Sequence, residues 1–328
     1  MTVVKNAGLA DPSCQIYMLF YYLGPAFVAF TLIPYSRTRI GITQPLSKWT
    51  ILKSASIAII DIFAQTLNYT GSTLSGPSIF SIIYSSVTIW TALYSRLLLA
   101  RRQSCIQWTG IIVVFLGLVV TATNSVQFGP DTFRGAIMVM VGSSAHALTY
   151  VLSEIVMVKG ETISSRQNCA IQGLVACFAY LLWQVFYTRP HFHDLVAEPM
   201  EEKGTSASGA IKLLLSLSAS NFIHALSFFH TLKYYPGGAT STGVMKGLQA
   251  VLVFVFTSLV FCGRYGSDEM CFSESKFASL CIVIGGVFLF GMASDAEGCA
   301  EEKDVMPLKE GYNPILGFED HPQVSEII

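Results

Sequence analysis

Polar and ionisable side chains recur at helical spacing inside several long apolar runs of this sequence. In the run from about residue 51 to 70, Asp61, Gln65 and Asn68 stand at i, i+4 and i+7, so they share one helical face. Such side chains are costly in hydrocarbon and usually face a cavity or a partner. Later runs contain similar stripes of polar residues along one helical face: His146, Tyr150 and Glu154; Ser220, His224, Ser227 and Thr231; and Thr240, Thr242, Lys246 and Gln249. Together these stripes predict a polar central cavity.

Lys246 is the strongest single candidate for binding a solute. An ammonium group held in a low-dielectric cavity attracts an anion strongly, and lysine commonly binds phosphate as a point charge. The alternatives are that Lys246 snorkels to the membrane interface, because it lies near the start of its run, or that it pairs internally with Asp61. The full candidate set for substrate binding is Lys246, Tyr84, Gln249, Asp61, Gln65, Asn68, His146, Tyr150 and His224.

Some of these residues also have a structural interpretation. Asp61 is equally consistent with a hub of structural hydrogen bonds. For His146 and His224 a satisfied core histidine is the preferred interpretation, although a proton-coupled carrier could use either ring. Glu154 lies near a helix end, where we expect a solvated carboxylate. No catalytic or phosphate-cradling motif and no metal-ligand cluster accompanies them, so we expect a protein that is not an enzyme and needs no cofactor or metal.

The elements that carry these side chains are predicted to be membrane helices. The chain of 328 residues is 52% hydrophobic and only 12% charged, whereas a soluble domain carries about a quarter charged residues. A net charge of -1 argues against a nucleic-acid partner, which would require a basic face. The fold class is therefore an all-α polytopic membrane protein with nine transmembrane helices. They are expected at about 14–35, 51–70, 74–99, 105–122, 133–158, 168–187, 210–232, 238–262 and 277–293.

An internal similarity suggests two inverted repeats, a pattern common in transporters. Placing Gly238 on Gly76 aligns two runs that both begin with glycine and a small polar patch, and it makes Tyr84 the counterpart of Lys246. The first repeat then has four spans and is one helix short of a symmetric ten-helix transporter. The predicted divisions are a short leader at 1–13, a first repeat at 14–123, a second repeat of five spans at 133–294, and an acidic tail at 295–328 that is expected to be disordered.

Lysine and arginine are unevenly distributed among the loops, and short cytoplasmic loops are enriched in them. If the spans alternate, most of these residues fall on one side together with the C-terminal tail. The C-terminus is therefore predicted to be cytoplasmic and the N-terminus lumenal or extracellular. The residues that determine this orientation are Arg37, Arg39, Arg101, Arg102, Lys159, Arg166 and Lys233.

The eight cysteines lie mostly inside apolar runs and show neither a C-x-x-C pair nor zinc-type spacing. We interpret them as small apolar packing residues. Cys262 and Cys271 flank one loop, and they could pair if that loop faces an oxidising lumen.

The stretch from Leu67 to Val120 contains Thr91-Ala92-Leu93, then the basic turn Arg101-Arg102, and then Gln107-Trp108 at the start of the next run. This order resembles a signature of the drug/metabolite transporter superfamily (EamA-like), and within it the nucleotide-sugar transporter branch of eukaryotic solute carriers. The similarity extends more weakly over about residues 14 to 294. It implies a ten-helix transporter fold in which a basic residue at the position of Lys246 contacts nucleotide phosphates.

Three functions are consistent with these observations. The leading hypothesis is alternating-access antiport of an anionic nucleotide sugar or related metabolite across an endomembrane, such as that of the Golgi, rather than the plasma membrane. The second is proton-coupled export of amines, amino acids or drugs, which Asp61 and the histidines could serve. The third is a truncated membrane protein that transports nothing. The expected partners are a small-molecule solute and the lipid bilayer, and a homodimer is left open.

Overall fold

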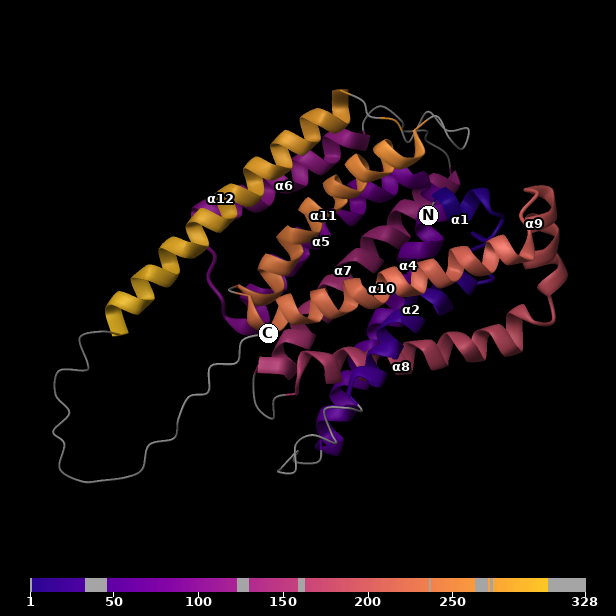
Figure 1. The fold of residues 1–328 in the computed structure, drawn as a ribbon. Helices are drawn as coiled ribbons and strands as arrows, with labels where there is room; N and C mark the ends of the chain where they lie inside the picture. The colour runs from indigo at the N-terminus through magenta and orange to yellow at the C-terminus, as the bar shows by residue number, and fades with distance from the viewer. Residues whose placement is uncertain are drawn as a thin grey trace.

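The computed structural model describes residues 2–32, 46–122, 130–158, 163–235, 237–262, 271 and 274–305, and this part of the chain is helical without a strand (Figure 1). The predicted all-α fold class is thus confirmed over the described residues. The elements are α1 (Thr2–Asn6), α2 (Ile16–Phe27), η1 (Val28–Leu32), α4 (Lys48–Tyr84), α5 (Val87–Leu99), α6 (Cys105–Ala122), α7 (Pro130–Val158), α8 (Ser165–Trp183), η3 (Gln184–Thr188), η4 (His193–Ala197), α9 (Glu198–Glu202), α10 (Ala207–Tyr234), α11 (Gly238–Phe261) and α12 (Glu274–Val305).

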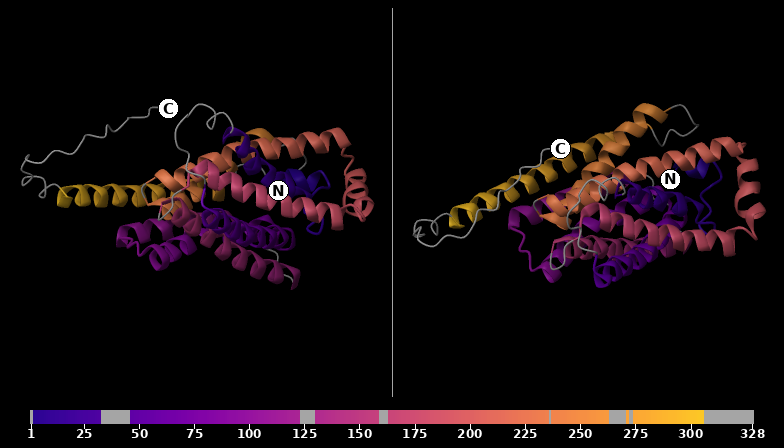
Figure 2. Two further views of the ribbon diagram at one scale, coloured as in Figure 1. Left: turned by 90° about the horizontal axis from the view of Figure 1, so that it is seen from below. Right: turned by 60° about the horizontal axis from the view of Figure 1, so that its bottom comes forward.

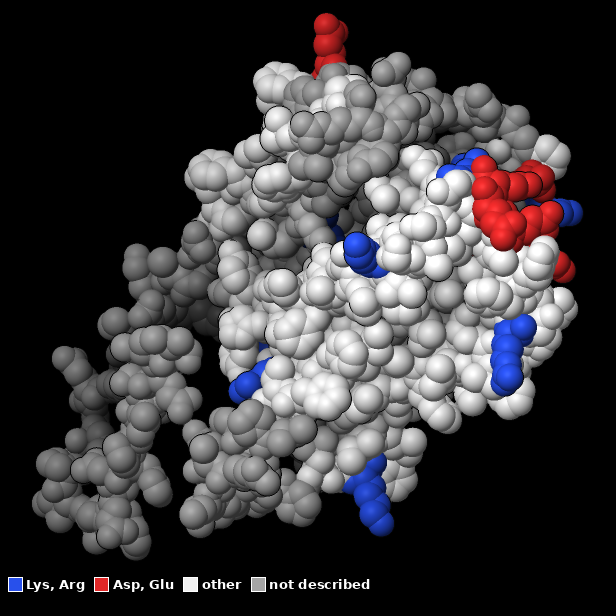
Figure 3. Space-filling view, turned by 45° about the vertical axis from the view of Figure 1, so that its right-hand side comes forward, with Lys and Arg blue, Asp and Glu red and all other residues white. Residues whose placement is uncertain are grey.

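Four segments of these helices are long and apolar enough to cross a membrane: Lys48–Gly76, Pro130–Val158, Ser165–Thr188 and Ala207–Tyr234. Large apolar side chains point outward from the bundle, and Phe178 and Ile223 are 62% and 66% exposed. Charged side chains are few and scattered over the white part of the face in Figure 3, apart from one acidic patch. Exposing so large an apolar surface to water is unfavourable, so this surface faces lipid and the chain is an integral membrane protein. Shorter apolar helices cover Ile16–Leu32, Val87–Leu99, Cys105–Val120 and Phe277–Met292.

Helices α4 and α7 approach closely because glycines lie in their contact. A Cβ built on Gly142 would lie 2.5 Å from Asn68 Oδ1 and 2.8 Å from the Ala64 carbonyl oxygen, while one on Gly135 would lie 2.7 Å from the Ser75 nitrogen. The later residue of α7 meets the earlier residues of α4, so the two helices are antiparallel. Small residues are typical of such contacts between membrane helices. This close contact is what brings the polar stripe of α4 against that of α7.

Gly76 interrupts α4. Its φ of 79° and ψ of 164° are not helical, so the element consists of two helices joined at a break. Glycine adopts a positive φ without the steric cost that a Cβ imposes. The second predicted span therefore extends to Ser75 instead of ending near residue 70. The third is itself divided, because a turn at Ser85 and Ser86 separates the end of α4 from α5.

The segment from about 188 to 209, predicted to be an exposed loop, contains the π-helical turn η4 and the short helix α9. Val196 of η4 is 3% exposed and packs with Val4 and Leu9 of the N-terminal segment and with Leu214 of α10. Helix α9 is acidic, and acidic side chains gather in a patch at the right of Figure 3. The predicted leader is therefore docked on this end of the bundle.

Two basic residues of the predicted cytoplasmic loops, Arg101 and Lys233, lie at one end of the bundle. Arg101 contacts Glu154 of α7 and the carbonyl oxygen of Gly237 before α11, while Lys233 Nζ donates to the Ile163 carbonyl oxygen at 2.9 Å. Helix α12 extends past the other helices and into the predicted tail (Figure 2). The predictions for Arg37, Arg39, Lys159 and residues 306–328 lie outside the described residues.

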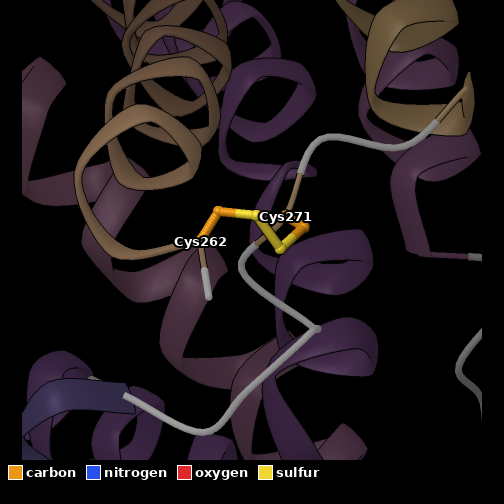
Figure 4. The surroundings of a disulfide bond; sticks show 2 residues. All are labelled: Cys262 and Cys271. Carbon is orange, nitrogen blue, oxygen red and sulfur yellow. A yellow bond between two sulfur atoms is a disulfide. The ribbon is translucent and has the colours of Figure 1, made fainter. Parts of the chain in front are cut away.

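Cys262, at the end of α11, forms a disulfide with Cys271, and their Cα atoms are 4.6 Å apart (Figure 4). The interpretation of these two cysteines as packing residues was wrong, and the pairing named as the alternative is the one observed. Free thiols are found at Cys14, Cys105, Cys169, Cys177 and Cys281, and two of them, Cys14 and Cys169, are buried. The bond closes the connection between α11 and α12 at the end of α11 opposite Gly237.

Candidate functional site

A polar cavity lies among α2, α4, α7, α8, α10 and α11. Its volume is about 70 Å³, counted as the space open to the centre of a water molecule. Six of the nine predicted site residues line it, which agrees with the expectation that the polar stripes face one another. They are Asp61, Gln65, His146, Tyr150, His224 and Lys246.

Asp61 is the hub of a hydrogen-bond network that joins α2, α4 and α7. Its Oδ1 lies 2.7 Å from His146 Nδ1, and its Oδ2 accepts a hydrogen bond from the Tyr22 hydroxyl at 2.6 Å. A carboxylate only accepts, so the geometry places the Nδ1 proton on the histidine. Both oxygens of Asp61 therefore already have partners inside the protein.

His146 also has a partner for its second ring nitrogen. Its Nε2 lies 2.8 Å from the Tyr150 hydroxyl and 3.2 Å from the Gln65 amide nitrogen. The Gln65 amide nitrogen only donates, so Nε2 is its acceptor, and the Tyr150 hydroxyl can donate to the same nitrogen. Both ring nitrogens of His146 therefore have partners inside the protein.

Lys246 projects from α11 toward two aromatic rings. Its Nζ is 5.6 Å from the centroid of the Tyr150 ring and 5.3 Å from that of Phe228, distances at which a cation is attracted to the ring face. It makes no ion pair with any side chain that the structure describes. The ammonium lies at the cavity and not at the membrane interface, so snorkelling does not describe it. It forms no direct ion pair with Asp61, although the two charges face the same cavity and attract each other.

Three predicted site residues do not line the cavity. Asn68 is buried in the contact with α7, where its Oδ1 accepts from the Ser143 hydroxyl at 3.5 Å. Tyr84 stacks on Phe80 with centroids 5.0 Å apart, and its ring lies behind His146 at 6.2 Å. Gln249 is exposed on the outside of α11. Gln249 stands three residues after Lys246 and so near the same face of α11, but that face also borders the exposed surface, and sharing it does not bring Gln249 to the cavity.

The cavity also contains residues that the sequence reading did not select. Tyr21 and Tyr22 come from α2, Gln172 from α8, and Asn221 and Phe228 from α10. The run at 14–35 contains no Asp, Glu, Lys, Arg or His, so no charged side chain in the sequence indicated that this span borders the cavity. A usable signal existed in α10, where Asn221 and Phe228 stand three residues before and four residues after His224 and so share its face.

Glu154 is not solvated, contrary to the expectation from its place near a helix end. Its side chain is 4% exposed, and its Oε1 lies 2.8 Å from Arg101 Nη2. The carboxylate can be buried because Arg101, in the connection from α5 to α6, lies over the end of α7 and pairs with it.

The chain is similar to known transporters. Residues 8–123 match the model of the EamA-like transporter family. Solute carrier family 35 member F6 of Rattus norvegicus is 20% identical over 300 residues, covering 86% of this chain and 78% of the relative. The Mus musculus protein of the same name is 22% identical over 232 residues, covering 65% of this chain and 61% of the relative.

The fold also has a counterpart among solved structures. One protein crystal structure superposes with a TM-score of 0.65 at 13% identity and covers 88% of this chain and 92% of the other. At so low an identity the match establishes a shared fold alone. The sequence similarities, and not this match, bear out the resemblance to the drug/metabolite transporter superfamily that the motifs between Leu67 and Val120 indicated.

Proposed function

We propose that this chain is an alternating-access antiporter of an anionic nucleotide sugar or related metabolite. The proposal is supported by the match of residues 8–123 to the EamA-like transporter family and by the similarity to family 35 solute carriers. One observation carries the choice of an anion: the Lys246 ammonium lies at a central cavity between two aromatic rings, without an ion pair among the described residues. An anionic group of the solute would complete that pair, and the rings of Tyr150 and Phe228 suit a planar base.

The charges of the cavity favour an anion over an amine. Asp61 could attract a cation, but its oxygens are engaged by His146 at 2.7 Å and by Tyr22 at 2.6 Å. A cationic solute would have to displace one of these partners and leave it unpaired in a buried site, which costs about 1 to 3 kcal/mol. An anion approaching Lys246 breaks no ion pair that the structure describes.

The size of the cavity supports a transport cycle with large conformational changes. A volume of about 70 Å³ on this measure holds a few water molecules, since one occupies roughly 10 to 15 Å³, whereas sites for drug-sized ligands enclose roughly 300 to 1,000 Å³. A nucleotide sugar would therefore enter only after the helices move apart. We assign this conformation to a contracted state of the cycle, in which the binding groups are close together.

The proposed architecture is nine spans in two inverted repeats. The hairpin that begins at Gly76 and ends with α6 has its counterpart in the hairpin of α11 and α12. Both begin at a glycine with positive φ, Gly76 at 79° and Gly238 at 49°. Their second helices pack on each other, because a Cβ on Gly110 of α6 would lie 2.8 Å from the Gly286 carbonyl oxygen of α12. Such a pairing is what a two-fold axis between the repeats would produce.

We propose that the end of the bundle with Arg101 and Lys233 faces the cytoplasm. The disulfide between Cys262 and Cys271 supports this orientation, since it lies at the opposite end of α11 and disulfides persist in oxidising compartments. We therefore place the protein in an endomembrane such as that of the Golgi, with the disulfide on the lumenal side. The C-terminus, which follows α12, would then be cytoplasmic.

Proton-coupled export is the second candidate function. It is favoured by the pair of Asp61 and His146, whose 2.7 Å contact and tyrosine partners could hold or release a proton inside the membrane. In that case Lys246 would set the charge of the site without contacting the solute.

The test is uptake of labelled UDP-, GDP- and CMP-linked sugars into liposomes that contain the purified protein and are preloaded with UMP, GMP or CMP. We expect uptake that requires the matching nucleotide inside, that is lost in Lys246→Ala, and that persists in Lys212→Ala, a control at an exposed lysine of α10. Flux of amines driven by a pH gradient alone would favour the second candidate. No flux of either kind would indicate a protein that does not transport these solutes.

A further inference from the structure

Arg101, Glu154 and the start of α11 form a compact charged cluster at one end of the bundle. Arg101 Nη2 lies 2.8 Å from Glu154 Oε1, and Arg101 Nη1 donates to the Gly237 carbonyl oxygen at 2.6 Å. Resting on the proposed transport function, we propose that the ion pair of Arg101 and Glu154 is the gate at this end of the cavity, closed in this structure and opened whenever solute passes on this side.

The cluster joins three helices through two residues. Arg101 follows α5, Glu154 belongs to α7, and Glu154 Oε2 accepts a hydrogen bond from the Ala239 backbone nitrogen in the first turn of α11 at 2.7 Å. A carboxylate at a helix N-terminus satisfies a free N–H group and interacts favourably with the helix dipole. Gly238 allows this approach, because a Cβ there would overlap the Glu154 carboxylate. Separating Arg101 from Glu154 therefore releases the connection after α5 from α7 and from the Gly237 carbonyl oxygen before α11, and leaves the hydrogen bond of Ala239 to Glu154 as the contact of the cluster that still joins α11 to α7.

The position of the cluster suits a gate. Tyr150 lines the cavity and precedes Glu154 by four residues, about 6 Å along α7, while Lys246 follows Ala239 by seven residues, about 10 Å along α11. Neither Arg101 nor Glu154 lines the cavity itself. Fully buried apolar side chains belong to the same end, among them Met157 and Leu232, each 0% exposed. Movement of α5 or α11 away from α7 would open a path through this layer.

The chemistry of the cluster suits a contact that opens and closes. Buried ion pairs contribute little net stability compared with apolar groups of similar size, so a permanent brace would not require one. When the two groups separate at the end of the bundle, each regains hydration, whereas separating apolar surfaces exposes them to water. The Arg101 side chain is already 35% exposed, so water reaches one partner before the pair breaks.

The native thiol of Cys169 offers a direct reporter, because it lines the cavity and is 0% exposed. The rate at which a membrane-impermeant methanethiosulfonate modifies Cys169 would be measured by mass spectrometry of its peptide, with reagent added to either face of reconstituted vesicles. Wild type would be compared with Glu154→Gln, Arg101→Gln, the charge swap Arg101→Glu with Glu154→Arg, and the control Arg102→Gln, which changes the exposed neighbouring arginine.

We expect modification from the Arg101 side to rise at least about tenfold in both single variants, to stay at the wild-type rate in the control, and to fall back toward it in the swap. Unchanged rates in folded Arg101→Gln protein, or equal increases from both faces, would overturn the proposal. Arg101→Gln keeps the Glu154 contact with α11, so it serves if Glu154→Gln does not fold. The measurement requires no solute, so its result is independent of whether nucleotide exchange occurs.

Discussion

Replacing Lys246 by methionine removes its charge while keeping an unbranched side chain of similar length. The ammonium has two aromatic rings within 5.6 Å and no ion pair among the described residues, so its charge is available to a solute. Two unit charges 4 Å apart attract by about 4 kcal/mol at an effective dielectric constant of 20. Because the solute also loses hydration, the net contribution is closer to that of a hydrogen bond to a charged group, about 1.5 to 3 kcal/mol. This corresponds to an increase of about 10- to 150-fold in the half-saturation concentration.

The assay is the concentration dependence of nucleotide-sugar exchange in liposomes, with the pair of nucleotide and sugar that the wild type exchanges fastest. Lys246→Arg keeps the charge and should stay within about fivefold of wild type, while Lys212→Met tests the effect of losing an exposed lysine elsewhere. Thermal unfolding in detergent would verify that each variant is folded. A folded Lys246→Met protein with an unchanged half-saturation concentration would falsify the assignment of this ammonium to the anion.

Three further predictions concern the helix contact, the network and the disulfide. Gly142→Val should lower the unfolding temperature, since even a Cβ would lie 2.5 Å from Asn68 Oδ1. Gly285→Val should leave the unfolding temperature unchanged, because nothing lies within 4 Å of a Cβ there. Equal shifts in the two variants would contradict the close packing of α4 and α7. Tyr22→Phe removes the 2.6 Å hydrogen bond to Asp61 and should cost about 1.5 to 3 kcal/mol, measured by denaturant unfolding; no change would show that water replaces the hydroxyl. Denatured protein labelled with a maleimide polymer should gain two labels after reduction, and an unchanged count would exclude the disulfide of Figure 4.

The sequence predicted the class of the fold and several parts of the site because both depend on local periodicity. Asp61 and Gln65 share a helical face by their spacing, and so do His146 and Tyr150, and all four line the cavity. The same rule failed at Asn68, which continues the stripe of α4 but is buried against Gly142. Spacing shows only that two residues lie on roughly the same face of a helix. It does not show whether that part of the face borders the cavity or packs against the neighbouring helix.

The break at Gly76 shows a second limit of local reasoning. The glycine, serine and proline there predict a turn, yet the helix before it continues to Ser75, because a membrane helix ends where its backbone groups find other partners instead of where its apolar residues stop. Turn residues therefore locate a connection to within a few positions, and the packing of α4 on α7 determines the boundary.

Composition and periodicity by themselves determined that this chain forms helices in a membrane and that polar stripes turn away from lipid, because hydrocarbon excludes unpaired polar groups wherever they occur. Only the tertiary structure decided which stripes meet. Asp61 finds His146 at a separation of 85 residues, Arg101 finds Glu154 at 53, and neither pairing follows from the residues next to them. Those partners are selected by the closeness of helix contacts such as that of α4 and α7, where a glycine sets the distance between backbones. The surroundings of Lys246 are decided in the same way, since the rings beside its ammonium come from Tyr150 of α7 and Phe228 of α10.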